Sequence, residues 1–263
     1  MGNTGIFHQD NKTIDFIIAV KDIEERGTDR LYWALYSLTH QTILPNKIFV
    51  VDGSINKDPI KKIAKQFDCE YVAVNMAILN IPVLWNKGIK LSKAEYVGMS
   101  CVDVIYEKGF IEYMTSRLQK KTLFLTYAGY LTEIPTKENI DTQYWWDKMK
   151  KICEFKSRDG LLQLVEREWI TEIRGYDERY LLWTCMDVDL TRRARDDGLE
   201  VKTMFQEKEV GVFHQEHPRY KDFSEEALLQ QKINHALYER DLSITKNQAH
   251  WGESEVIPCI KQE

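Results

Sequence analysis

The alternation of short apolar runs with amphipathic stretches along residues 14–100 most constrains the fold of this chain. Four runs have the length of a strand and are almost continuously apolar: IDFIIAV (14–20), KIFVVD (47–52), CEYVAV (69–74) and EYVGMS (95–100). Such runs are typical of strands that are covered on both faces. The stretches between them show helical spacing, at residues 30–41, 58–67 and 82–94. This alternation predicts an α/β fold with a mostly parallel sheet flanked by helices.

The rest of the chain is less regular. Strand-like segments are LFLTYAGYL (123–131) and EVKTMF (200–205), and WITEI (169–173) is compatible with an extended segment. Helical patterns cover residues 142–155, 185–197 and 224–242. The sequence contains no internal repeat and no low-complexity segment, which favours one domain with a C-terminal appendage.

Composition excludes several classes of protein. Lys and Arg number 36 against 41 Asp and Glu, a net charge of −5 that argues against a nucleic-acid-binding surface. The five cysteines are scattered without a CxxC pair, so neither a disulfide framework nor a zinc site is indicated. No segment approaches the roughly 18 consecutive apolar residues of a membrane span, and the N-terminal residues lack the apolar core of a signal peptide. We therefore expect a cytoplasmic protein, and peripheral contact with a membrane stays open.

Two acids stand where a parallel sheet binds its ligands. Asp52 and Asp103 each follow directly on an apolar run, and such sheets bind ligands at the carboxyl ends of their strands. The glycine-rich phosphate loops GxxxxGK[ST] and GxGxxG are absent, as are the GxSxG elbow and the HExxH zinc helix. A nucleotide bound at this edge must therefore be held by other residues.

Three stretches match a known pattern in order and at plausible spacing. Residues 34–54 match "AL.S...Q......I.VVD.GS", residues 86–103 match "N.G...A..EY....D.D", and residues 175–198 match "GFDE.......ED.DL..R....G". Over about residues 14–217 the chain resembles glycosyltransferase family 2, a group of inverting enzymes with a GT-A fold. The resemblance implies a GT-A domain over residues 1–222, followed by a C-terminal helical extension over 223–263. Within the domain it implies a nucleotide-binding half at about 14–103 and an acceptor half at about 104–222.

The resemblance assigns five positions to the nucleotide sugar, Asp103 among them. Asp52 matches the acid that contacts the base, and a carboxylate there could accept a hydrogen bond from a uracil or thymine ring N–H. The backbone near Ala19 would hold the same base. Asn86 and Gly88 match the "N.G" that lies against the nucleotide sugar. Two plainer interpretations stay open: Asp52 as a turn-forming residue, and Asn86 as a helix-surface residue.

The resemblance also implies a metal site, for Mn²⁺ or Mg²⁺. Asp103 matches the last acid of the DXD motif, whose first acid is replaced here by Cys101, a poor partner for Mg²⁺. His214 resembles a downstream histidine that completes the metal site in some family members. His217, three residues later, is a weaker candidate. A structural role for a single histidine is the alternative.

Asp187 matches the second acid of the "ED" pair, the general base that removes the proton of the acceptor hydroxyl. Met186 replaces the first acid. Capping of a helix N-terminus is the plainer alternative for Asp187, and Asp189 is expected to cap or to pair with Arg192 or Arg193. Trp183 and Tyr176 are expected on the acceptor side of the cleft, although Trp183 could equally belong to the core.

The expected activity is transfer of a sugar from a nucleotide-diphosphate sugar, with inversion, to an acceptor hydroxyl in glycan or polysaccharide assembly. A UDP-sugar is favoured, GDP or dTDP donors are possible, and the acceptor is a glycan or glycolipid; the oligomeric state stays open. Loss of two family acids, at Cys101 and Met186, motivates the alternative of an inactive nucleotide-sugar or glycan-binding module. A nucleotidyltransferase is a weaker alternative, because the first loop, AVKDIEERG, lacks the glycines and basic residues it would need.

Overall fold

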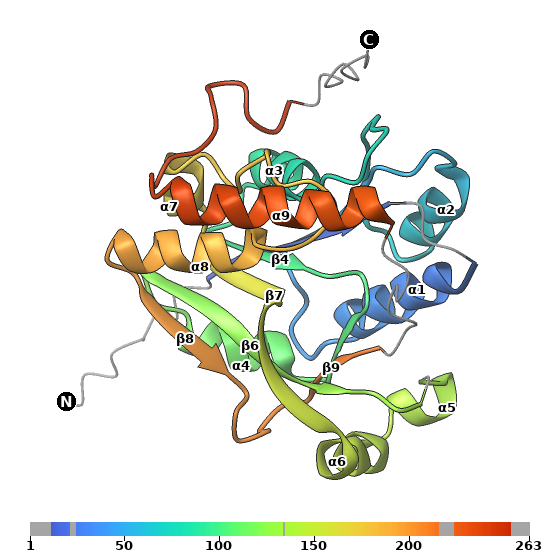
Figure 1. Ribbon diagram of the computed structural model, residues 1–263. Helices are drawn as coiled ribbons and strands as arrows, with labels where there is room; N and C mark the ends of the chain where they lie inside the picture. Colours follow the sequence, from blue (N-terminus) through green and yellow to red (C-terminus); the bar gives the residue numbers. More distant parts are fainter. Residues whose placement is uncertain (1–11, 22–24, 134, 216–223, 254–263) are drawn as a thin grey trace, which may run out of the picture.

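The first four strands form the parallel half of a single sheet, as their apolar runs predict. A computed structural model of the chain describes residues 12–21, 25–133, 135–215 and 224–253 (Figure 1). The strands lie in the order β3-β2-β1-β4 and all pair in parallel. Their bounds are β1 Ile14–Val20, β2 Lys47–Asp52, β3 Glu70–Ala73 and β4 Tyr96–Ser100. The helices between them are α1 Glu25–Thr39, α2 Asp58–Gln66 and α3 Ile81–Leu91.

Local sequence explains where two of these helices begin. A proline stands in the first turn of both α2 and α3, where its missing N–H would have no helical partner. At α3 the side chain of Asn80 also accepts a hydrogen bond from the Val83 amide at 3.0 Å. These start signals are local in the sequence, and the predicted bounds agree closely with the structure.

The second half of the sheet is mixed. Its strands are β5 Val104–Tyr106, β6 Thr122–Tyr130, β7 Glu154–Glu166, β8 Glu200–Met204 and β9 Val212–His214. β7 pairs antiparallel with both β4 and β6 and so joins the two halves, while β8 and β9 pair in parallel with β6. β5 pairs antiparallel with β9. The remaining helices are α4 Phe110–Arg117, α5 Lys137–Ile140, α6 Gln143–Ile152, α7 Arg167–Glu172, α8 Met186–Asp196 and α9 Glu225–Arg240.

One element was predicted wrongly and a long one was missed. The segment 169–173 lies in and just after α7 and is not extended, and its buried residues Trp169, Ile170 and Ile173 follow helical spacing. The strand β7 lacks a recognisable pattern because the polar run KSRDG lies in its middle. The sheet is thus mixed but mostly parallel, with helices on both faces.

The alternating side chains of the central strands divide the core between the two faces of the sheet. Phe16 and Ile18 of β1 pack with α1, α2 and α4 on one face, whereas Ile17 packs with α3, α7 and α8 on the other. A smaller third cluster contains Trp145 and Trp146 of α6, each only 3% exposed. Two of the three aromatics at 144–146 are therefore core residues, while Tyr144 is 80% exposed.

The C-terminal segment packs onto the sheet-and-helix body. Helix α9 lies beside α8 (Figure 1), with Arg192 donating a hydrogen bond to the carbonyl of Tyr238 at 3.0 Å. Trp251, which is 7% exposed, belongs to the same core cluster as Trp85 of α3. Lys90 of α3 donates to the Trp251 carbonyl at 2.9 Å. The segment from 224 to 253 is thus part of the core.

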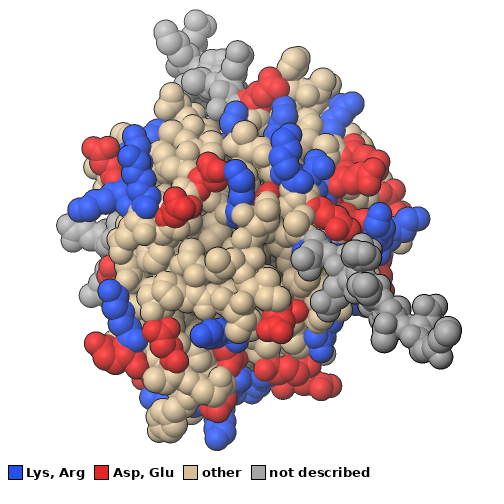
Figure 2. Space-filling view, turned by 180° about the vertical axis from the view of Figure 1, so that it is seen from behind, with Lys and Arg blue, Asp and Glu red and all other residues tan. Residues whose placement is uncertain are grey.

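The surface in Figure 2 carries no single-sign patch. Basic and acidic side chains are interspersed around a central area without charged groups on this face. Within the residues that the structure describes, no helix has the length and apolarity needed to cross a bilayer.

Candidate active site

The parallel strands bring three of the predicted site residues to one edge of the sheet. Asp52 is the last residue of β2 and pairs with Val20 near the end of β1, directly beside Ala19. The neighbouring strand β4 ends at Ser100, and Asp103 follows three residues later. Ala19 is half-buried at this edge. The edge therefore presents the end of β1, Asp52 and Asp103 together, as the sequence predicts.

Asp52 is engaged within the protein. Its side chain is buried, its Oδ1 accepts the Ser54 amide at 2.7 Å, and its Oδ2 accepts the Tyr71 hydroxyl at 2.8 Å. The first bond is an Asx-type turn, so the turn-forming role left open by the sequence is present. Lys57 closes the same turn by donating to the carbonyls of Ser54 and Val74 at 2.7 and 2.8 Å. A base that contacts Asp52 would therefore have to bind a carboxylate that already accepts a hydrogen bond from Tyr71.

Asp103 and His214 lie together, although 111 residues separate them in the sequence. The His214 Nε2 is 3.4 Å from the Asp103 Oδ2. Antiparallel pairing of β5 with β9 sets this distance, because Val104 is the register partner of His214 and the Gln215 amide donates to the Asp103 carbonyl at 2.7 Å. The Tyr130 ring lies 4.9 Å from the His214 ring, between centroids. Backbone hydrogen bonds of the sheet thus fix the main chain of both residues.

This pair fits a divalent cation. A carboxylate oxygen and an imidazole nitrogen together suit Mn²⁺, whereas Mg²⁺ strongly prefers oxygen ligands. Among the residues that the structure describes, no group of three or more His, Cys, Asp or Glu side chains could hold a metal. A cation at Asp103 and His214 would therefore leave most of its coordination positions to a ligand. The weaker candidate His217 lies outside the described residues.

Cys101 is not placed as a metal ligand. Its thiol is directed at the carbonyl of Gly160 in β7, with Sγ to oxygen 2.8 Å. Burial raises the pKa of the Cys101 thiol well above its ordinary value, and the charges of Asp103 and Asp187 act in the same direction. A neutral thiol bonded to a carbonyl replaces the first acid of the motif.

Asp187 also lies against Gly160. A β-carbon built on Gly160 would stand 2.6 Å from the Asp187 Oδ2, so the carboxylate rests against the glycine backbone. Gln163, also of β7, donates to the Asp187 carbonyl at 3.0 Å and to the Thr191 hydroxyl at 3.0 Å. Neither Gly160 nor Gln163 was predicted as a site residue. The sequence signals that could have indicated them were a glycine and a polar glutamine within one strand.

The chain reaches Asp187 through an unusual loop. Leu182, Thr184 and Cys185 all have left-handed backbone conformations, with φ of 61°, 86° and 68°. Cys185 is the N-cap of α8 and makes no side-chain capping bond, so Asp187 lies one position into the first turn. An acid in this turn also interacts favourably with the helix dipole, so the plainer role for Asp187 stays open. Trp183 in this loop is half-buried, with part of its ring packed against the core.

Three other predicted residues lie inside the fold. Asn86 is buried, accepts the Tyr176 amide and donates to the Tyr176 carbonyl, both at 2.8 Å, so it is not a surface residue of its helix. A β-carbon on Gly88 would approach the Ile17 Cγ2 to 2.3 Å, so this glycine permits close packing of α3 on β1. Tyr176 is fully buried and its hydroxyl donates to the Gln163 Oε1 at 2.7 Å. Their burial does not support the direct ligand contacts predicted from the motif; they hold neighbouring segments in place.

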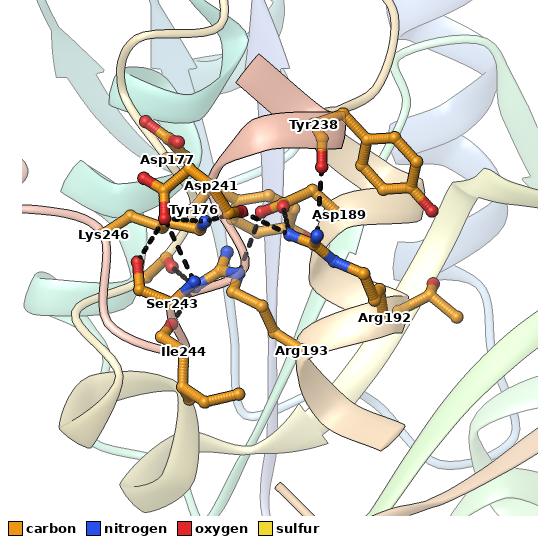
Figure 3. A network of polar contacts seen from close by, with 12 residues as sticks. Tyr176, Asp177, Asp189, Arg192, Arg193, Tyr238, Asp241, Ser243, Ile244 and Lys246 are labelled. Atoms are coloured by element: carbon orange, nitrogen blue, oxygen red, sulfur yellow. Dashed lines mark hydrogen bonds and ion pairs between the residues drawn. The ribbon is translucent and has the colours of Figure 1, made fainter. Parts of the chain in front are cut away.

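A polar network anchors α8 behind the site (Figure 3). The buried Asp189 carboxylate binds Arg192 at 2.6 Å and Arg193 at 2.9 Å, which confirms the predicted pairing. Arg193 also donates to the carbonyls of Gly175 and Ile244, and Arg192 to that of Asp241. The network thereby connects α8 with the 175–178 loop and with the segment that follows α9.

Comparison with known proteins places the chain by its fold. No family model matches the sequence, and no curated protein matches it. Among solved structures, GalNAc-T7 with UDP, GalNAc and Mn²⁺ superposes with a TM-score of 0.63 at 12% identity, covering 88% of this chain and 49% of that one. TarS from S. aureus superposes with a TM-score of 0.58 at 11% identity, covering 86% of this chain and 39% of that one.

The chain thus spans about half of the first of these proteins and about two fifths of the second. Both are GT-A glycosyltransferases. The mixed and mostly parallel sheet flanked by helices agrees with this likeness. The chain therefore has the GT-A glycosyltransferase fold.

Proposed function

We propose that this protein transfers a sugar from a nucleotide-diphosphate sugar to an acceptor hydroxyl, with inversion at the anomeric carbon. One observation carries the proposal: the Asp103 carboxylate lies beside His214, and the Asp187 carboxylate lies against Gly160, whose carbonyl accepts the thiol of Cys101, two residues before Asp103. Inversion needs a base on the acceptor side and charge neutralisation on the leaving-group side. The proposal assigns Asp187 to the first task and Asp103 to the second.

Asp103 and His214 would hold the divalent cation, Mn²⁺ in preference to Mg²⁺. Bound there, the cation would neutralise charge on the diphosphate leaving group. The choice of Mn²⁺ follows from the imidazole nitrogen, and GalNAc-T7 was crystallised with Mn²⁺. The neutral Cys101 thiol adds no negative charge beside this pair.

Asp187 is proposed to accept the proton of the acceptor hydroxyl. Its carboxylate is half-buried in the first turn of α8, where the positive end of the helix dipole stabilises a negative charge. The backbone of Gly160 lies against this carboxylate and Gln163 donates to the Asp187 backbone carbonyl, and both contacts restrict where the side chain lies. Trp183, exposed in part beside it, is proposed to pack against the acceptor sugar.

A UDP-sugar is the proposed donor, with its base at the carboxyl edge near Asp52. There the base would have to share a carboxylate that already accepts hydrogen bonds from Ser54 and Tyr71. GalNAc-T7 was crystallised with UDP. The proposed acceptor is a glycan or glycolipid, in polysaccharide assembly on the cytoplasmic side, with peripheral contact to the membrane when the acceptor is lipid-linked.

Thermal unfolding with nucleotides tests the proposal. UDP with Mn²⁺ is expected to raise the Tm, because a ligand that binds only the folded state stabilises it by mass action. The same Tm measurement with GDP and with dTDP gives the comparison. Hydrolysis of a panel of nucleotide sugars then identifies the donor sugar. No Tm response to any of the three nucleotides, with or without metal, contradicts the proposal.

A nucleotide-sugar-binding module without catalysis is the second candidate. The replacement of two acids, by Cys101 and Met186, favours it. The two candidates differ in turnover: the module would show the UDP-dependent Tm shift but neither transfer nor donor hydrolysis.

A further inference from the structure

The loop that leads to Asp187 is held in an unfavourable backbone conformation. Leu182, Thr184 and Cys185 are non-glycine residues with positive φ, and Thr184 is also β-branched. Left-handed conformations are unfavourable for such side chains and persist only where the surroundings stabilise them. The groups that hold this loop therefore decide where Trp183 and Asp187 lie.

Asn234 of α9 provides the densest set of contacts to this loop. Its side chain is fully buried, and its Nδ2 donates to the carbonyls of Leu181 at 2.9 Å and Trp183 at 3.0 Å. The Thr184 carbonyl lies 3.5 Å from the same nitrogen. An amide NH₂ group has two protons, and both are directed at the loop.

The orientation of this amide is itself defined. Gln230, one turn earlier in α9, donates from Nε2 to the Asn234 Oδ1 at 2.9 Å, so the oxygen faces a donor and the nitrogen faces carbonyls. On its other side the loop is held by Leu79, whose carbonyl accepts the Leu182 amide at 2.8 Å. The loop thus lies between α9 and the segment that precedes α3.

We infer that Asn234 is a positioning residue that sets the conformation of the 181–185 loop and, through it, the placement of Asp187 and Trp183. The inference rests on the proposed function for its consequence in catalysis, but the placement of the loop can be measured independently. It also assigns a role to α9, whose one fully buried polar side chain among the described residues reaches across to this loop.

The isosteric variant Asn234→Asp tests this inference. It keeps the volume of the side chain but removes both N–H donors, so the three loop carbonyls lose their partner. Asn46→Ala is a control for the loss of an amide hydrogen bond far from the loop, because the exposed Asn46 donates from Nδ2 to Asp15 at 2.7 Å and directly precedes β2 at the opposite edge of the sheet. Both variants and the unchanged protein are compared by hydrogen exchange, UDP affinity and transfer kinetics.

In Asn234→Asp, amides of residues 181–189 are expected to exchange at least roughly tenfold faster, while the amides of β1 and α3 are unchanged. Transfer is expected to fall roughly 10- to 100-fold in kcat, as misplacement of a reacting group by about 1 Å produces, with UDP affinity retained. Asn46→Ala should lose thermal stability without either change.

Unchanged exchange at 181–189 overturns the inference, whatever the activity. So does a loss of UDP affinity equal to the loss of transfer, since that indicates general unfolding. A third outcome separates the two proposals. If exchange at 181–189 rises in Asn234→Asp, but the unchanged protein neither transfers sugar nor hydrolyses any nucleotide sugar, the positioning of the loop stands and the proposed function fails.

Discussion

At the scale of single residues, the site is organised around the backbone of Gly160. Its carbonyl accepts the Cys101 thiol, and its α-carbon lies against the Asp187 carboxylate. A β-carbon here would lie 2.6 Å from the Asp187 Oδ2, so any other residue would displace this carboxylate. The absence of a side chain at Gly160 thus allows the carboxylate of Asp187, the proposed base, to lie where it does.

Asp187→Asn is expected to lower transfer by at least about 10²-fold, because an amide cannot accept the proton of the acceptor hydroxyl. The UDP- and Mn²⁺-dependent Tm shift should remain, since Asp103 and His214 are untouched. Transfer kinetics and thermal unfolding measure the two effects. Retained transfer refutes the assignment of the base.

Gly160→Ala is expected to lower kcat with little change in stability. The added methyl group meets the far end of a flexible carboxylate side chain, which can rotate away at small energetic cost but then leaves its catalytic position. Gly98→Ala in β4 is the control, because the methyl group added there has the side chains of Phe16 and Leu162 as its nearest neighbours. Gly198→Ala is not suitable, because φ is 81° at Gly198 and any side chain would be strained. A Gly160→Ala protein that transfers normally contradicts this account of the site.

The metal pair makes a separate prediction. His214→Ala and Asp103→Asn should each abolish the Mn²⁺-dependent part of the UDP shift, because each removes one of the two proposed protein ligands. Cys101→Ser should leave the Mn²⁺ response intact, since the thiol is directed at a carbonyl. Titration of Mn²⁺ into protein saturated with UDP measures both. A Cys101→Ser variant that loses the Mn²⁺ response, with both other variants normal, refutes the proposed ligands.

At the scale of elements, helix α8 carries the proposed base on one side and a buried ionic anchor on the other. Asp187 faces β7, whereas Asp189 binds Arg192 and Arg193. Burial lowers the pKa of the Arg193 guanidinium, and the charge of Asp189 opposes that effect. The helix is therefore held from behind while its first turn faces the site.

Asp189→Asn is expected to destabilise the protein by about 3–5 kcal/mol, the usual cost of leaving one partner of a buried ion pair uncompensated. Asp196→Asn, on the exposed end of the same helix, is the matched control and should change stability little. Urea unfolding at neutral pH gives both values. Equal stability of the two variants contradicts the interpretation of Figure 3 as a structural anchor.

At the scale of the whole molecule, the segment from 224 to 253 completes the body formed by the preceding residues. Trp251 lies in the core beside α3, and Asn234 and Tyr238 of α9 contact the loop and helix that carry the proposed base. The proposed boundary at residue 222 therefore separates regions that share a core.

A protein shortened to residues 1–222 is expected to fold poorly. It would lose the core residue Trp251 and leave Arg192 and Arg193 without several of their carbonyl partners. Thermal unfolding and near-UV circular dichroism of the shortened and full chains measure this. A cooperative transition at the Tm of the full chain would establish 223–263 as a dispensable extension.

The sequence alone determined the parallel half of the sheet, the placement of Asp52 and Asp103 at its carboxyl edge, and the pairing of Asp189 with arginines. These features follow from local periodicity, strand ends and helical spacing, which need no knowledge of distant residues. Only the tertiary structure decided the strand β7, the burial of Asn86 and Tyr176, the contact of Gly160 with Asp187, and the reach of Asn234 to the 181–185 loop. Each depends on which distant segment lies alongside, and strand pairing and side-chain burial over such separations leave no periodic pattern in the sequence.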